Sequence, residues 1–362
     1  MAAGRYFSQD YAEARGRFRD ACRQAGAWIE THESPARGPS GETLTTEAAW
    51  LGPPEAERVL VTLSATHGVE GFCGSGVQCG WLESGLGKEL PPGTALLQIH
   101  AINPYGFAWL RRVTEENVDL NRNFVDHDAP YPVNEGYEAL REVICPAEWN
   151  DAVVAETQAA LDAYAEAQGS RALQKAITGG QYSHAEGIFY GGDRPTWSHG
   201  LLKRIFRDKL ARARQVAVID YHTGLGPYGY GERICIHDPG SEGLARAMAW
   251  YDEDVTSPAL GNSASVELFG FNVMGMEEVL PAGTAFTAIA LEYGTIPSPE
   301  VRLALRADNW LHVHSEPDSA KGRAIKAQSR AAFYPDRGDW KEMVWERAIE
   351  TQRQAFQGLA EG

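Results

Sequence analysis

Three short apolar segments of this chain are each followed by side chains that can take part in catalysis. These are residues 59–63 with His67 and Glu70, residues 216–221 with His222, and residues 285–291 with Glu292. Short apolar runs of this length are typical of buried strands. Because ligands bind at the carboxyl ends of neighbouring parallel strands, the pattern predicts that the four polar side chains meet at one edge of a sheet.

The rest of the chain alternates between predicted strands and predicted helices. Further strands are expected at 43–51, 94–100 and 234–236, and helices at 6–29, 76–82, 148–168, 201–214, 242–251, 301–312 and 340–356. Turns or loops are expected at 34–41, 103–106, 117–124 and 179–192. Such alternation is typical of an α/β protein. We therefore expect a mixed, mainly parallel central sheet with helices on both faces. We expect one domain spanning 1–362, with the N-terminal helix and the C-terminal helices packed on its core.

The composition argues against several classes of protein. Lys and Arg number 33 and Asp and Glu number 49, so the net charge is -16, which disfavours nucleic acid and anionic membrane surfaces as partners. The five cysteines include no Cys-x-x-Cys pair, which disfavours a disulfide framework or a thiolate zinc site. The N-terminal residues do not read as a signal peptide, and no apolar stretch reaches membrane-spanning length, so a cytoplasmic protein is expected. The oligomeric state is left open.

His67, Glu70 and His222 are the residue types of a catalytic zinc site. Zn²⁺ accepts imidazole nitrogen and carboxylate oxygen, and a catalytic site combines three protein ligands with one open position. Zinc supplies a Lewis acid that activates water and polarises a carbonyl. Glu292 is the candidate general base, and Asp119 can accept the second ring N–H of a ligand histidine.

The negative intermediate of such a reaction also needs a positive partner. Arg111 and Arg112 precede the polar segment that contains Asp119, and either could provide it.

The order of these motifs resembles the zinc carboxypeptidase family, whose superfamily includes the succinylglutamate desuccinylases and aspartoacylases. The matching pieces are His67-x-x-Glu70, Arg112, Val118-Asp119-Leu120-Asn121-Arg122-Asn123-Phe124, Asp220-x-His222 and Glu292. His-x-x-Glu alone occurs often by chance, whereas the Asp-Leu-Asn-Arg-Asn-Phe run is far more specific. The resemblance extends from about residue 59 to residue 292, which is most of the predicted core.

The resemblance implies a role for each matching residue. It assigns zinc binding to His67, Glu70 and His222, support of the first ligand to Asp119, binding of the substrate's free carboxylate to Asn121 and Arg122, oxyanion stabilisation to Arg112, and the general base to Glu292. It favours Arg112 over Arg111. Classical members also bring a tyrosine over the substrate, and nothing here chooses between Tyr228, Tyr230 and Tyr251.

We therefore expect a zinc-dependent metallohydrolase that cleaves an amide bond next to a free carboxylate. The expected substrate is either a short peptide, as for a metallocarboxypeptidase, or a small molecule. The small molecule would be an N-acyl amino acid, as for an amidohydrolase of the aspartoacylase or desuccinylase type. Another possibility is a zinc protein without turnover that binds a carboxylate ligand, although the candidate base Glu292 speaks against it. A serine hydrolase is disfavoured because Ser75 does not lie in a Gly-x-Ser-x-Gly motif.

Overall fold

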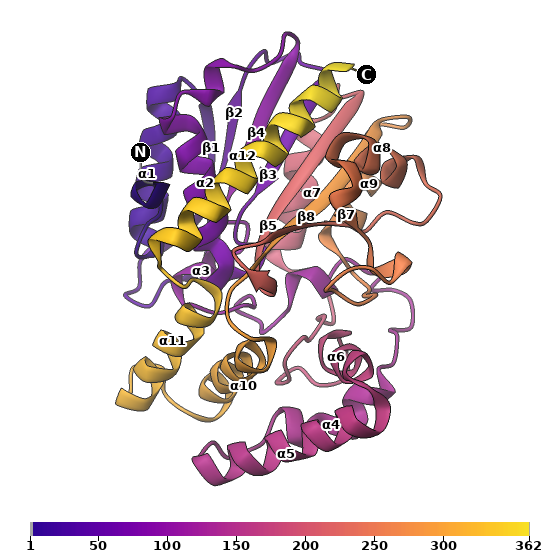
Figure 1. Cartoon of the computed structure of the whole chain (residues 1–362). Coiled ribbons are helices and arrows are strands. Elements are labelled where there is room, and N and C mark those ends of the chain that lie inside the picture. The colour runs from indigo at the N-terminus through magenta and orange to yellow at the C-terminus, as the bar shows by residue number, and fades with distance from the viewer. Residues whose placement is uncertain (1–2, 362) are drawn as a thin grey trace.

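The computed structural model describes residues 3–361, apart from the side chain of Glu253, and within this range an eight-stranded sheet forms the centre (Figure 1). The strands are β1 (Trp28–Arg37), β2 (Thr43–Leu51), β3 (Arg58–Leu63), β4 (Thr94–His100), β5 (Gln215–Tyr228), β6 (Gly231–Cys235), β7 (Val255–Thr256) and β8 (Ala285–Gly294). Their spatial order is β1-β2-β4-β3-β5-β8-β6-β7. The pairings β4–β3, β3–β5, β5–β8 and β6–β7 are parallel and the other three are antiparallel. This confirms the predicted mixed, mainly parallel sheet.

Helices cover both faces of the sheet, as predicted. Alternate residues of a strand point to opposite faces, so Leu60 packs in one apolar cluster, and Val59 and Val61 pack in another. The first cluster includes side chains from α1 (Tyr11–Ala25), α2 (Gly71–Glu83), α8 (Glu242–Tyr251) and α12 (Gly338–Glu361). The second cluster includes α7 (Trp197–Lys209) and α9 (Asn272–Glu278). Figure 1 shows α12 lying across the near face of the sheet, with α7 behind it.

A further group of helices gathers at one end of the sheet (Figure 1). These are α4 (Glu135–Ile144), α5 (Asp151–Gln168), α6 (Ser170–Thr178), α10 (Ser298–His314) and α11 (Ala320–Phe333). Their apolar side chains share a third cluster, which also contains Val69 and Phe189. Among residues 3–361, none of the helices has both the length and the apolar composition of a membrane span.

The start of the chain differs from the prediction. The helix expected at 6–29 is shorter, because Gly26 takes a left-handed φ of 74° and ends α1. Residues 28–37 then form β1, so the turn predicted at 34–41 is wrong for its first four residues. β1 is an antiparallel edge strand in which most side chains are polar, and Pro35 lies at an irregular point of its pairing. An edge strand of this kind lacks the apolar pattern that reveals a buried one.

The predicted positions of His222 and Glu292 also need correction. Both residues lie inside strands, not after them, because β5 and β8 continue to pair beyond the end of β3. The last pair between β3 and β5 joins Leu63 to Asp220, whereas the β5–β8 ladder continues through His222 paired with Glu292. The α2 helix begins directly after Glu70, five residues before the predicted start at residue 76. Within residues 3–361, five α-helices were not predicted: α3 (Pro104–Ala108), which overlaps the turn expected at 103–106, and α4, α6, α9 and α11.

Candidate functional site

The loop that carries the first candidate ligands is held against residues 106–112. The backbone N–H groups of Gly68 and Val69 donate hydrogen bonds to the carbonyl oxygens of Arg112 and Arg111, over 3.1 and 2.8 Å. A Cβ atom on Gly68 would lie only 2.0 Å from the carbonyl carbon of Gly106. The close approach of the two backbones therefore requires glycine at this position.

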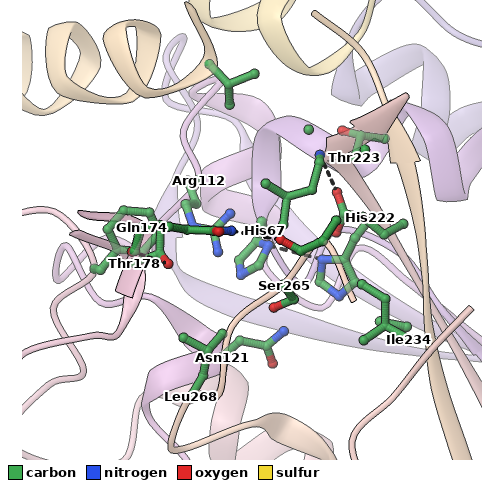
Figure 2. A pocket seen from close by; sticks show the side chains of 18 of the residues that line it. His67, Arg112, Asn121, Gln174, Thr178, His222, Thr223, Ile234, Ser265 and Leu268 are labelled. Carbon is green, nitrogen blue, oxygen red and sulfur yellow. Dashed lines mark hydrogen bonds between the residues drawn. The ribbon is translucent and has the colours of Figure 1, made fainter. Parts of the chain in front are cut away.

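Three buried donor groups meet at the end of β3 and within β5. His67 Nδ1 lies 3.0 Å from Glu70 Oε1, and His222 Nδ1 lies 3.2 Å from Glu70 Oε2. The two Nδ1 atoms are 3.1 Å apart, and the three residues can offer ligand atoms that all lie within 4.8 Å of one another. Figure 2 shows the imidazole rings of His67 and His222 side by side among the residues that line the cavity.

The far side of each imidazole faces a carboxylate. His67 Nε2 lies 3.2 Å from Asp119 Oδ1, and His222 Nε2 lies 2.9 Å from Asp220 Oδ2, although the latter contact does not have hydrogen-bond geometry. A carboxylate at Nε2 favours the tautomer with its proton there, which leaves the Nδ1 lone pair free. Two imidazole lone pairs and a carboxylate therefore converge on one point, and this donor set fits Zn²⁺.

The charges around these donors favour a cation between them. Burial opposes the charge of Glu70, but the imidazoles of His67 and His222 hold its pKa well below the usual range. Burial likewise lowers the pKa of His222, but Asp220 and Glu70 raise it well above the usual value. The same carboxylates would stabilise a divalent ion held by these residues.

Arg112 joins the candidate ligands to Asp119. Its Nη1 donates to Glu70 Oε1 over 3.0 Å and its Nε donates to Asp119 Oδ2 over 2.9 Å. The guanidinium also lies 5.1 Å from the centre of the Phe189 ring. Burial raises the pKa of Asp119, but Arg112 more than compensates and holds it well below the usual range. Arg111 is buried elsewhere, donating to Asp308 over 3.1 Å, so the structure places Arg112 and not Arg111 at the site.

Arg122 is buried without an acidic partner within hydrogen-bond or ion-pair distance among the described residues. Its guanidinium donates to two backbone carbonyls, those of Asn121 (2.8 Å) and Thr178 (2.6 and 3.2 Å). Asn121 accepts the Asn272 N–H at its side-chain oxygen over 3.2 Å, which leaves its NH₂ group available. Both predicted carboxylate-binding residues therefore line the cavity with unused donors.

Glu292 lies on β8 opposite His222 of β5 and is only 8% exposed. Its Oε1 accepts the Leu225 N–H over 2.9 Å, while no hydrogen bond is made by Oε2 within the described part of the chain. Burial and the nearby charge of Glu70 raise the pKa of Glu292 to about 8. This is the partial desolvation that its place at the end of an apolar run predicts.

These side chains open onto one cavity of about 330 Å³ (Figure 2). Six of the eight predicted site residues line it, and Glu70 and Asp119 lie behind them. Its remaining walls include the apolar side chains of Ile234, Ile236, Leu268, Phe271, Val273 and Ala290. None of the candidate tyrosines Tyr228, Tyr230 and Tyr251 is among the described residues that line it.

Some residues at the site carry roles that were not predicted. Asp220 faces His222 and accepts hydrogen bonds from Thr66 Oγ1 (2.9 Å) and Asn272 Nδ2 (2.8 Å). The alternation of side chains along a strand places Asp220 and His222 on the same face, and this signal could have revealed its role. Phe189 comes from the loop at 179–192 and lies under both arginines, a position for which the sequence carries no local signal.

A serine hydrolase needs a serine beside a histidine, and Ser75 and His100 form such a pair away from the cavity. Ser75 Oγ lies 2.9 Å from His100 Nε2, but Ser75 is 1% exposed and His100 is fully buried. Neither residue lines the cavity. The serine is therefore buried away from the cavity at which the candidate ligands meet.

One known protein family matches the chain over most of its length. A family model described as "Protein of unknown function (DUF2817)" matches residues 7–347. No curated protein matches the sequence.

Among solved structures, the chain is similar to bovine thrombin-activatable fibrinolysis inhibitor in complex with tick carboxypeptidase inhibitor (10% identity, 95% of this chain and 98% of that chain, TM-score 0.44). It is also similar to a putative carboxypeptidase A from Shewanella denitrificans (13%, 96% and 71%, 0.41). A third is the succinylglutamate desuccinylase from Chromobacterium violaceum (13%, 87% and 72%, 0.37). These are the classes that the sequence resemblance named. At TM-scores below 0.5 the similarity is distant, and the activity has to be inferred from the site of this chain.

Proposed function

We propose that this chain, which belongs to the DUF2817 family, is a zinc-dependent hydrolase that cleaves an amide bond next to a free carboxylate. One observation carries the proposal. Two imidazoles and a carboxylate converge beside a single cavity. Within residues 3–361, that cavity is also lined by a buried carboxyl group with a free oxygen and by an arginine without an acidic partner. Together these groups supply the parts that carboxylate-directed amide hydrolysis requires.

His67, Glu70 and His222 would hold the metal ion. Zinc bound there would act as a Lewis acid, activating water and polarising the scissile carbonyl. Asp119 and Asp220 support this role, because a carboxylate beside Nε2 favours a ring proton there and leaves Nδ1 free to bind.

Glu292 would act as the general base. The Leu225 N–H fixes one of its oxygens, which leaves the other to accept a proton from the attacking water. A carboxyl group with a raised pKa can hold that proton and then donate it to the nitrogen of the leaving amine. One buried side chain can therefore serve as base and then as acid.

Two arginines would each bind a different negatively charged group, the substrate's carboxylate and the oxyanion. Arg122 and the Asn121 amide have donors free to bind the substrate's carboxylate, for which a guanidinium fork is well suited. Arg112, whose charge is secured by Asp119 and Glu70, would stabilise the oxyanion that forms during attack.

Short peptides and N-acyl amino acids both contain an amide next to a free carboxylate, so both are candidate substrates. The test is to assay purified protein for metal and to screen blocked dipeptides and N-acyl amino acids with and without chelator. We expect about one zinc per chain, hydrolysis that requires the free carboxylate, and recovery by added zinc after chelation. Zinc-loaded protein that binds but hydrolyses none of these compounds would instead indicate a binding protein.

A further inference from the structure

A second arginine that has no acidic partner within ion-pair distance among the described residues lines the same cavity. Arg302 lies on α10, where Ser298, Val301, Arg302 and Leu305 all face the cavity. Their spacing of three and four residues places them on one side of the helix. The inference drawn from Arg302 concerns the substrate and rests on the proposed hydrolytic function.

Arg302 differs from the other two arginines of the cavity in its contacts. Arg112 contacts two carboxylates, and Arg122 contacts two backbone carbonyls. Arg302 is half-buried, yet within residues 3–361 it makes no hydrogen bond or ion pair. The exposed Asp162 on α5 affects the pKa of Arg302 only through longer-range electrostatics, and burial lowers the pKa of Arg302. A partly desolvated guanidinium with unused donors is costly unless a ligand brings an anion to it.

Arg122 and Arg302 reach the cavity from different parts of the chain. They come from different elements, a short turn after residue 119 and the helix α10. If the substrate's first carboxylate binds at Arg122 and Asn121, the donors of Arg302 are left for another anionic group in the same cavity.

We propose that the substrate carries a second anionic group and that Arg302 recognises it. The substrate class is thus a dianion: one carboxylate binds at Arg122 and Asn121, and the other binds at Arg302. The second carboxylate can come from a dicarboxylic acyl group, from an acidic residue on the acyl side of a peptide, or from an acidic side chain in the amine part.

Three pairs of compounds distinguish these sources. They are N-succinyl-alanine with N-succinamoyl-alanine, N-acetyl-Glu-Ala with N-acetyl-Gln-Ala, and N-acetyl-Glu with N-acetyl-Gln. Within each pair the charged and neutral compounds have nearly the same shape, so their ratio of kcat/KM isolates the second charge. We expect the zinc-loaded protein to prefer the charged member of one pair by about tenfold to a hundredfold, as for one hydrogen bond to a charged group.

The variant Arg302→Gln should lose this preference while keeping the rate on the neutral member, and Arg302→Lys should keep part of it. Because Arg302 makes no hydrogen bond or ion pair with the described residues, its replacement should not lower stability. Arg323→Gln is the matched control, since Arg323 is exposed on α11 and the change in charge is the same.

The inference is overturned if no pair shows a charge preference, if Arg302→Gln keeps it, or if Arg323→Gln loses it equally. Hydrolysis of the neutral members with any of these results leaves the proposed function standing. If no compound is hydrolysed, the proposed function fails, and calorimetric titration with the same pairs still tests Arg302. Equal affinities of the wild type and Arg302→Gln for the charged member would then refute the role.

Discussion

Replacing Arg122 by lysine keeps a positive charge in the cavity but removes its planar fork. A guanidinium has five N–H donors, and three of those on Arg122 are used by the carbonyls of Asn121 and Thr178. Two donors therefore remain, one on each terminal nitrogen, which is the arrangement that binds both oxygens of a carboxylate. The lysine ammonium carries all its donors on one atom and cannot reproduce that geometry.

The size of the effect follows from the donors that are lost. A hydrogen bond to a charged group contributes roughly 1.5–3 kcal/mol. Arg122→Lys gives up one of the two substrate contacts, so we expect a loss of about 2 kcal/mol, or about thirtyfold in kcat/KM. Arg122→Met gives up both contacts and the charge, so we expect a loss of about 4 kcal/mol, close to a thousandfold.

The assay compares a substrate with its C-terminal carboxamide in wild type, both variants and the exposed control Arg212→Lys, all loaded with zinc. The ratio of the two rates removes any general effect of disturbing the Thr178 carbonyl, because that effect acts on both substrates. The preference for the carboxylate should fall in the order wild type, Arg122→Lys, Arg122→Met. An unchanged ratio in folded Arg122→Met would show that the carboxylate binds elsewhere.

Three further predictions concern the metal and the base. His67→Ala and His222→Ala should each reduce zinc content well below about one per chain by mass spectrometry, and full occupancy in both would contradict the ligand assignment. Glu292→Gln should keep its zinc and its fold but lower the single-turnover rate by roughly two to four orders of magnitude, and a near-normal rate would mean that another group is the base. Gly68→Ala should weaken zinc binding and lower Tm, because its Cβ would lie 2.0 Å from the Gly106 backbone; an unaltered zinc affinity would show that the loop tolerates the shift.

Much of the site's location could be predicted because it depends on strands with clear sequence signals. β3, β5 and β8 are buried on both sides, and their apolar runs show where the chain enters the sheet. Since the three strands are adjacent and parallel, His67, His222 and Glu292 come together as the strand-end pattern predicts. The roles of these residues remain predictions, as does the single-domain boundary.

The parts that were missed depend on tertiary contacts. Phe189 reaches the two arginines from a loop with no regular pattern, and its left-handed φ of 55° has no local cause in the sequence. Arg302 looks like any surface arginine of an amphipathic helix until α10 is placed beside the cavity. β1 pairs at an edge of the sheet through its backbone. Its mostly polar side chains therefore lack the apolar pattern that predicts a strand.

The register of β5 against β8 restricts how this protein can change in length. His222 and Glu292 are paired residues in one ladder, and successive side chains of a strand point to opposite faces. Inserting or deleting one residue between Gln215 and His222 would turn His222 away from Glu70 while leaving the composition of the strand almost unchanged. Random libraries made to alter specificity should therefore tolerate substitutions along β5 far better than single-codon insertions. Length variation should instead survive at exposed loop positions such as Gly169, between α5 and α6, where the chain lies at the surface.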